Sequence, residues 1–84
     1  MEHQIPNDKQ LESLIKQEKW LRRLYERTRA NVHGFQAHQH AQAKWKLALF
    51  KLHLAYALRA GNEERIKQAK FDIEVAQADP FLYR

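Results

Sequence analysis

The sequence contains no cysteine, and its 84 residues include only two prolines and two glycines. Without cysteine the chain forms neither disulfides nor thiolate zinc sites, and nothing in it requires an oxidising compartment. A hydrophobic content of 44% with so little proline and glycine is typical of a folded chain and not of a disordered one. We therefore expect one small helical domain, residues 1–84, with few turns.

Long apolar runs are also missing. Residues 47–50, for example, are followed directly by Lys51, whereas a membrane-spanning helix needs about 20 apolar residues. The stretch from Met1 to Pro6 has neither the basic nor the apolar region of a signal peptide. These absences predict a cytoplasmic protein that has no membrane partner.

The signatures of catalysis are absent as well. The sequence has no glycine-rich phosphate loop and no nucleophile elbow, and its only serine is Ser13. His33, His38 and His40 lie close together, but no two of them have the i, i+4 spacing that brings two imidazoles of one helix to the same metal ion. We therefore do not expect an enzyme, and we predict no catalytic residue, no cofactor and no metal ion.

The segment from residue 35 to residue 59 carries the strongest pattern in the chain. At about 100° per residue, its apolar side chains fall on two opposite sides of a helix. One side carries Ala41, Trp45, Ala48, Leu49, Leu52 and Tyr56. The other side carries Ala43, Leu47, Phe50, Leu54, Ala57 and Leu58. A helix that is apolar on both sides is buried between partners, so this segment is predicted to be the central helix of an all-α protein.

Turn signals divide the rest of the chain. Gly34 and Gly61 are typical residues at helix C-termini, Asn62 is a typical N-cap, and Pro80 ends a helix. The sequence thus predicts an extended lead over residues 1–7, helices over 8–33, 35–60 and 63–78, and an apolar tail over 79–84. The expected fold is a small three-helix bundle with a long antiparallel helical hairpin and a shorter third helix. Since no capping residue follows Gly34, a single long helix that tolerates this glycine stays an alternative.

The third predicted helix has a second apolar side, which contact with the central helix does not use. Phe71 and Val75 lie on that side, and formation of a homodimer is one way to cover them. The tail residues Phe81, Leu82 and Tyr83 either fold back onto the bundle or bind a partner. These five residues are the candidate protein interface. The leading hypothesis is a non-catalytic interaction protein (an adaptor, inhibitor or regulatory subunit) that docks a helical face onto a larger protein partner.

Basic residues outnumber acidic ones by 15 to 10, which gives a formal net charge of +5. On the first predicted helix four cations recur every three or four residues, with a tryptophan beside them: Lys16, Lys19, Trp20, Arg23 and Arg27. Such a row is either a solvated outer face or a surface for nucleic acid or another acidic partner. The chain has no recognisable helix-turn-helix, zinc-finger or RNA-recognition motif. A nucleic-acid-binding regulator that uses this row is therefore the alternative hypothesis.

The segment 54–80 combines an alanine-rich helix, a turn and a second helix with small residues. Its distinguishing positions are Gly61-Asn62, Ala69, Ala76 and Asp79-Pro80. This pattern resembles a single degenerate tetratricopeptide repeat, which implies two packed helices joined by a short turn. The interval from the turn glycine to the closing proline is longer than in that family, and the small residue expected where the helices cross is missing. One repeat spans roughly a third of the chain and cannot bury its own core, so no function follows from it.

Overall fold

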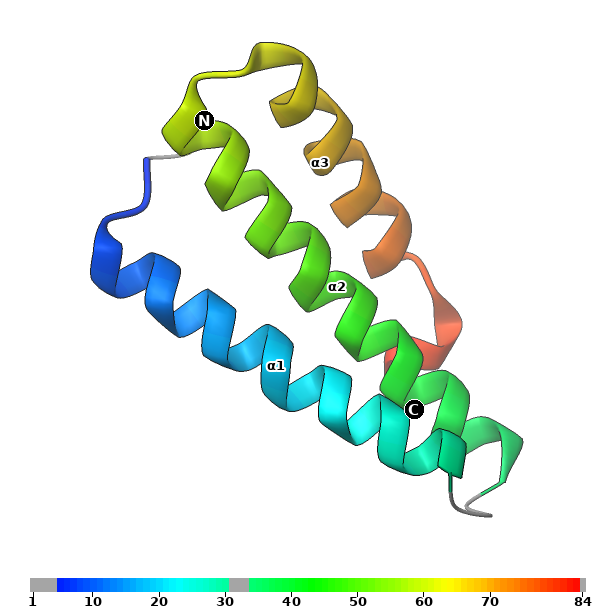
Figure 1. The fold of residues 1–84 in the computed structure, drawn as a ribbon. Coiled ribbons are helices and arrows are strands. Elements are labelled where there is room, and N and C mark those ends of the chain that lie inside the picture. The colour runs from blue at the N-terminus through cyan, green and yellow to red at the C-terminus, as the bar shows by residue number, and fades with distance from the viewer. Residues whose placement is uncertain (1–4, 31–33, 84) are drawn as a thin grey trace.

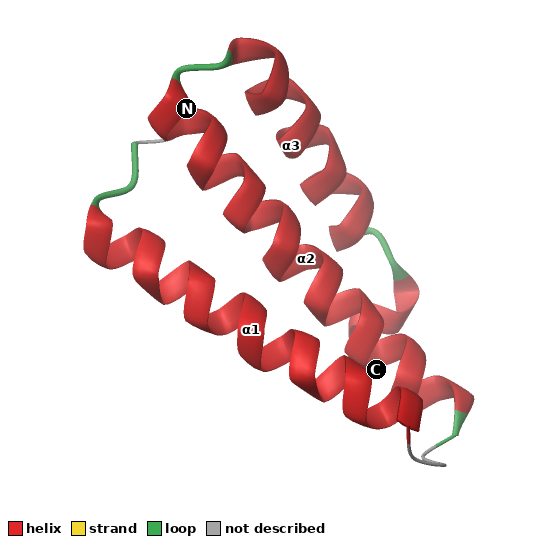
Figure 2. Cartoon of the chain, viewed as in Figure 1, coloured by secondary structure: helices red, strands yellow, loops and turns green. Residues whose placement is uncertain are grey.

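The computed structural model describes residues 5–30 and 34–83. Within these ranges the chain forms three α-helices and one short 3₁₀ helix, with no strand (Figure 2). The elements are α1 (Asp8–Ala30), α2 (Phe35–Ala60), α3 (Glu63–Gln77) and the 3₁₀ helix η1 (Pro80–Tyr83). The predicted all-α class with three helices is confirmed. The end of the first predicted helix, residues 31–33, lies outside the described residues.

Helix α2 lies in the middle of the fold, and the three helices run in alternating directions (Figure 1). Helix α1 packs along one side of α2 and α3 along the other, while η1 also contacts α2. Because the chain reverses direction between α1 and α2, the structure excludes a single continuous helix through Gly34. The molecule measures 42 × 24 × 17 Å, so the row of helices is long and thin. Much of each outer helix therefore faces solvent.

Buried residues occur on both of the predicted apolar sides of α2. Ala48 and Leu52 are buried on one side, and Leu54 and Ala57 are buried on the other. Most of the buried hydrophobic residues in the described chain are alanines. Small side chains let the helix backbones approach closely, but they fill little volume between the helices. Larger side chains consequently lie at the edges of the helix contacts, where many of them are only half-buried.

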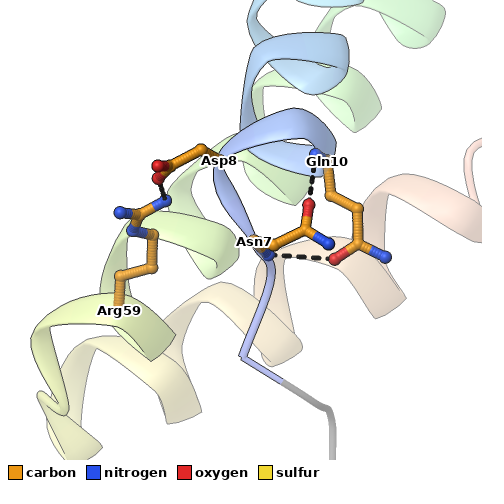
Figure 3. A network of polar contacts seen from close by, with 4 residues as sticks. All are labelled: Asn7, Asp8, Gln10 and Arg59. Atoms are coloured by element: carbon orange, nitrogen blue, oxygen red, sulfur yellow. Dashed lines mark hydrogen bonds and ion pairs between the residues drawn. The ribbon is translucent and has the colours of Figure 1, made fainter.

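The start of α1 is capped and lies beside the end of α2. The Asn7 side-chain oxygen accepts a hydrogen bond from the backbone N–H of Gln10 at 2.8 Å, and the Gln10 side-chain oxygen accepts one from the backbone N–H of Asn7 at 3.0 Å (Figure 3). This reciprocal pair is a capping box. Next to it, the Asp8 carboxylate lies 2.6 Å from the guanidinium of Arg59, near the end of α2. The first turn of α1 therefore meets the last turn of α2.

The turn between α2 and α3 is formed by Gly61 and Asn62. Gly61 has a φ of 66°, in the left-handed region, and its N–H and that of Asn62 donate to the carbonyls of Leu58 and Ala57. These bonds satisfy the last carbonyls of α2 in the manner of a Schellman cap. The Asn62 side-chain oxygen then accepts a hydrogen bond from the backbone N–H of Arg65 at 3.2 Å and caps α3. With only two residues in the turn, α3 folds back directly along α2.

The C-terminal tail folds back onto α2. The Nδ1 atom of His40 lies 2.7 Å from the carbonyl oxygen of Phe81, and the Phe81 ring packs edge-on against Phe35 at a centroid distance of 5.9 Å. Phe81 and Leu82 are half-buried as a result. Tyr83 remains 74% exposed, although its hydroxyl donates a hydrogen bond to the Gln77 carbonyl at 2.7 Å. Of the two alternatives for the tail, the structure therefore contains the folded-back one.

Candidate interaction surfaces

The contact between α1 and α2 contains a buried carboxylate. Glu18 is only 7% exposed, and its Oε2 atom accepts a hydrogen bond from the indole N–H of Trp45 at 3.1 Å. The guanidinium of Arg22 lies 3.7 Å from the same oxygen. A buried carboxylate needs such partners because it loses its hydration. The arrangement is explained by packing, and the Glu18 oxygen is already engaged by the protein.

An aromatic stack lies beside this carboxylate. The ring of Tyr25 lies 4.9 Å from that of His38 and 5.0 Å from that of Trp45, with interplanar angles of 27° and 21°. The Thr28 hydroxyl donates to the Tyr25 carbonyl at 2.8 Å, and its oxygen lies 3.4 Å from Nδ1 of His38. These contacts join α1 to α2 through side chains from both helices. They also place His38 inside a helix contact.

The described residues contain no group of three or more His, Asp or Glu side chains that could hold a metal ion. His38 is in the aromatic stack and His40 contacts the carbonyl of the tail residue Phe81. His33 lies outside the described residues. His53 is exposed on α2, with its ring 6.2 Å from that of Phe50. The histidines described here thus have separate surroundings.

The outer side of α3 carries the predicted interface residues of that helix. Phe71 is 60% exposed and Val75 is 56% exposed. On the side that packs against α2, Ala69 and Ala76 are buried, and Ile66 and Ile73 are half-buried. We call the exposed pair, Phe71 and Val75, the α3 apolar face. It is separate from the side chains that form the core.

A groove runs between the end of α2 and the first half of α3. It has a volume of about 620 Å³. Its lining residues are His53, Tyr56, Ala57, Ala60, Asn62, Arg65, Gln68, Ala69 and Asp72. Gln68 and Asp72, which are joined by a hydrogen bond of 2.9 Å, each precede a residue of the α3 apolar face by three positions. Since residues three apart are neighbours on a helix surface, the groove is continuous with that face.

A second hollow lies between α1 and α2, and Trp20 lines it. It has a volume of about 350 Å³. Its lining residues are Gln17, Trp20, Leu21, Lys44, Leu47, Ala48, Lys51 and Leu82. We call it the Trp20 hollow. Trp20 is 64% exposed, and the cations of the predicted basic row (Lys16, Lys19, Arg23 and Arg27) are all exposed on α1.

Of the predicted basic site, the hollow contains Trp20 but none of the four cations, and the structure places two other cations and a tail residue beside this tryptophan. Lys44 and Lys51 come from α2, and Leu82 comes from η1. The spacing of seven residues between the two lysines places them on one side of a helix, and that signal is visible in the sequence. Periodicity does not reveal which neighbouring helix lies beside that side. The contact of Leu82 with this region has no sequence signal at all.

Comparison of the chain with protein-family models, with curated proteins and with solved structures finds no match. The similarity of residues 54–80 to a tetratricopeptide repeat thus receives no support from these comparisons. In the part of the chain that the structure describes, no helix has the length and apolar character needed to cross a bilayer.

Proposed function

We propose that the chain is a non-catalytic interaction protein that docks the α3 apolar face and the adjoining groove onto a larger protein partner. The observation that supports this proposal is the exposure of Phe71 and Val75, at 60% and 56%. Clustered apolar side chains that a folded chain leaves exposed are typical of interaction sites. The role would be that of an adaptor, an inhibitor or a regulatory subunit in the cytoplasm.

The groove supports this proposal because it places a concave surface next to the α3 apolar face. Tyr56, which is 48% exposed, lines the groove together with Ala57 and Ala60 of α2. A partner helix placed along the groove would cover these residues and the α3 apolar face together. Arg65 and Asp72 at the same groove would supply polar contacts of both signs. This combination of an apolar centre and a polar rim is common in docking surfaces.

Two double variants, which change the net charge by the same amount, test the docking surface. Phe71→Asp with Val75→Asp lowers the net charge by two, and so does Lys70→Gln with Gln77→Asp at exposed polar positions of the same helix. Proteins that bind the unaltered chain are isolated with and without nuclease treatment and are identified by mass spectrometry. Each purified partner is then titrated with the chain and its variants, and calorimetry gives the Kd of each complex.

We expect the first variant to weaken binding by about 2 kcal/mol or more, roughly thirtyfold in Kd, because two apolar side chains lose their burial. The control variant should bind like the unaltered chain. Full binding by a folded Phe71→Asp, Val75→Asp protein would show that this face is not the interface. Unfolding of that variant would instead place both residues in the core and remove the basis of the proposal.

The alternative partner in this proposal is a second copy of the chain, since a homodimer would cover the α3 apolar face. A two-fold interface uses the same patch on both subunits, so one exposed face is sufficient to form it. Sedimentation equilibrium at tens of micromolar distinguishes the two forms. A single species of 10.1 kDa would rule out the homodimer and leave a different protein as the partner.

A second candidate function, nucleic-acid binding through the basic row, is favoured by one specific observation. Lys44 and Lys51 line the Trp20 hollow from α2, opposite the helix that carries the row. Two further cations thus lie beside Trp20, the aromatic residue of the predicted basic site. Titration with duplex and single-stranded oligonucleotides at about 50 mM salt tests this function, since phosphate contacts make binding steeply salt-dependent. If neither the duplex nor the single strand binds at that salt, this candidate function is excluded.

A further inference from the structure

We infer that the Trp20 hollow binds single-stranded nucleic acid, with a base stacked on Trp20 and phosphates held by Lys44 and Lys51. This inference rests on the second candidate function and specifies its ligand and its site. The hollow is open to solvent and has a volume of about 350 Å³, at the small end of the range of about 300 to 1,000 Å³ for ligand sites. It is large enough to seat one flat base.

The surroundings of Trp20 differ from those of the other tryptophan. Trp45 stacks on Tyr25 and donates its N–H to Glu18, so both its ring and its polar atom are used within the fold. Trp20 is 64% exposed at the edge of a concave site. A large, rigid aromatic ring in this position provides a stacking platform, and stacking is tolerant of base identity.

Two cations of α2 lie beside this platform in the hollow. Lys44 and Lys51 are seven residues apart, about 10 Å along α2. On α1, Lys16, Arg23 and Arg27 lie four residues before, three after and seven after Trp20, so they share its side of the helix. The ion pairs between described residues use Asp8, Glu12 and Glu18, and of these five cations they engage only Lys16, with both partners largely exposed. Lys44 and Lys51 thus present positive charge inside the Trp20 hollow, whereas the α1 cations lie outside its lining.

This geometry favours a single strand over a duplex or an acidic peptide. In a duplex the base faces are stacked inside the helix, so a duplex would reach the exposed cations but not the ring of Trp20. An acidic peptide would form ion pairs with the lysines, but its carboxylate side chains have no aromatic ring that could stack on Trp20. A single strand combines a continuous line of phosphates with unstacked bases, which matches two lysines beside an exposed aromatic ring.

The C-terminal tail contributes one wall of the site. Leu82 lines the Trp20 hollow, and it is held there by the neighbouring residue Phe81, whose carbonyl contacts His40 at 2.7 Å. The tail is therefore part of the proposed site and does not compete with the ligand for Trp20. Shortening of the tail would open the hollow on that side.

Fluorescence anisotropy of a labelled 12-nucleotide poly-dT strand, with a 12-base-pair duplex in parallel, tests the inference at about 50 mM salt. Three variants are compared with the unaltered chain: Trp20→Ala, Trp20→Phe, and Lys44→Gln with Lys51→Gln. Lys67→Gln with Lys70→Gln on α3 is the control for net charge, since both of its positions are exposed. Circular dichroism confirms that each variant is folded.

We expect the single strand to bind more tightly than the duplex. Trp20→Ala should weaken single-strand binding by about 5- to 150-fold, the range found for loss of one stacked base, and Trp20→Phe should restore part of it. Lys44→Gln with Lys51→Gln should reduce the slope of log K against log salt by about 1.4, because two phosphate contacts are lost. The control variant should leave this slope unchanged.

The possible failures are distinguishable. Equal binding of duplex and single strand, unchanged by Trp20→Ala, would overturn the single-strand site and leave nucleic-acid binding through the basic row intact. No binding to either oligonucleotide would remove both. Binding of poly-glutamate but not of poly-dT, if lost in Lys44→Gln with Lys51→Gln, would overturn the inference and assign the hollow to an acidic protein.

Discussion

The partly buried hydrogen bond between Glu18 and Trp45 provides the sharpest test of how α1 is held to α2. The perturbation is Glu18→Met, which keeps an unbranched side chain of similar length but removes the acceptor for the indole N–H at 3.1 Å. A hydrogen bond to a charged group contributes about 1.5 to 3 kcal/mol to stability. Trp45 is half-buried, so water can partly replace the lost acceptor, and we expect the lower part of this range.

Arg22 adds little to this estimate. Its guanidinium lies 3.7 Å from Glu18 and its side chain is 44% exposed, so the ion pair contributes less than about 1 kcal/mol. We therefore expect Glu18→Met to lower the free energy of unfolding by about 1.5 to 2 kcal/mol, which for a domain of this size lowers Tm by roughly 6 to 16 °C. Glu18→Gln keeps an acceptor oxygen and should lose less than about 1 kcal/mol.

A double-mutant cycle isolates the hydrogen bond from the change in packing. Trp45→Phe removes the N–H donor, and the combination of Glu18→Met with Trp45→Phe removes both partners. Urea unfolding followed by circular dichroism gives the four free energies, and their coupling should be about 1 to 2 kcal/mol. A coupling below about 0.3 kcal/mol would refute the reasoning, because contacts that do not interact are additive within that margin.

Three further predictions concern the turn and the basic row. Gly61→Ala should lower the free energy of unfolding in urea by about 1 to 2 kcal/mol, since residue 61 has a φ of 66° that a side chain disfavours; an unchanged value would show that the left-handed turn is absent. Asn62→Ala should cost about 1 kcal/mol by loss of the α3 cap, and Asn62→Asp, which keeps the acceptor, should cost less in the same assay. Lys19→Glu with Arg23→Glu should leave Tm nearly unchanged, since both residues are exposed. The same change should abolish any nucleic-acid binding at about 50 mM salt, and retained binding would return the row to a solvated face.

The local features of this fold could be predicted from the sequence, because their causes lie within a few residues. The two apolar sides of the central helix follow from periodicity, and both contain buried residues in the structure. The turn at Gly61 and Asn62 follows from the conformational freedom of glycine and the capping oxygen of asparagine. The exposure of Phe71 and Val75 also follows, because a helix that packs on one side leaves its other side uncovered.

The contacts between segments were decided by the tertiary structure alone. Periodicity places Glu18 near the apolar side of the first helix, but it does not specify that the indole of Trp45, 27 residues later, meets its carboxylate. It assigns Lys44 and Lys51 to one side of α2, but it cannot state that this side lies beside Trp20 and Leu82. The physical reason is that helix periodicity defines the faces of each helix, whereas the pairing of those faces depends on the fit of side chains that are distant in sequence.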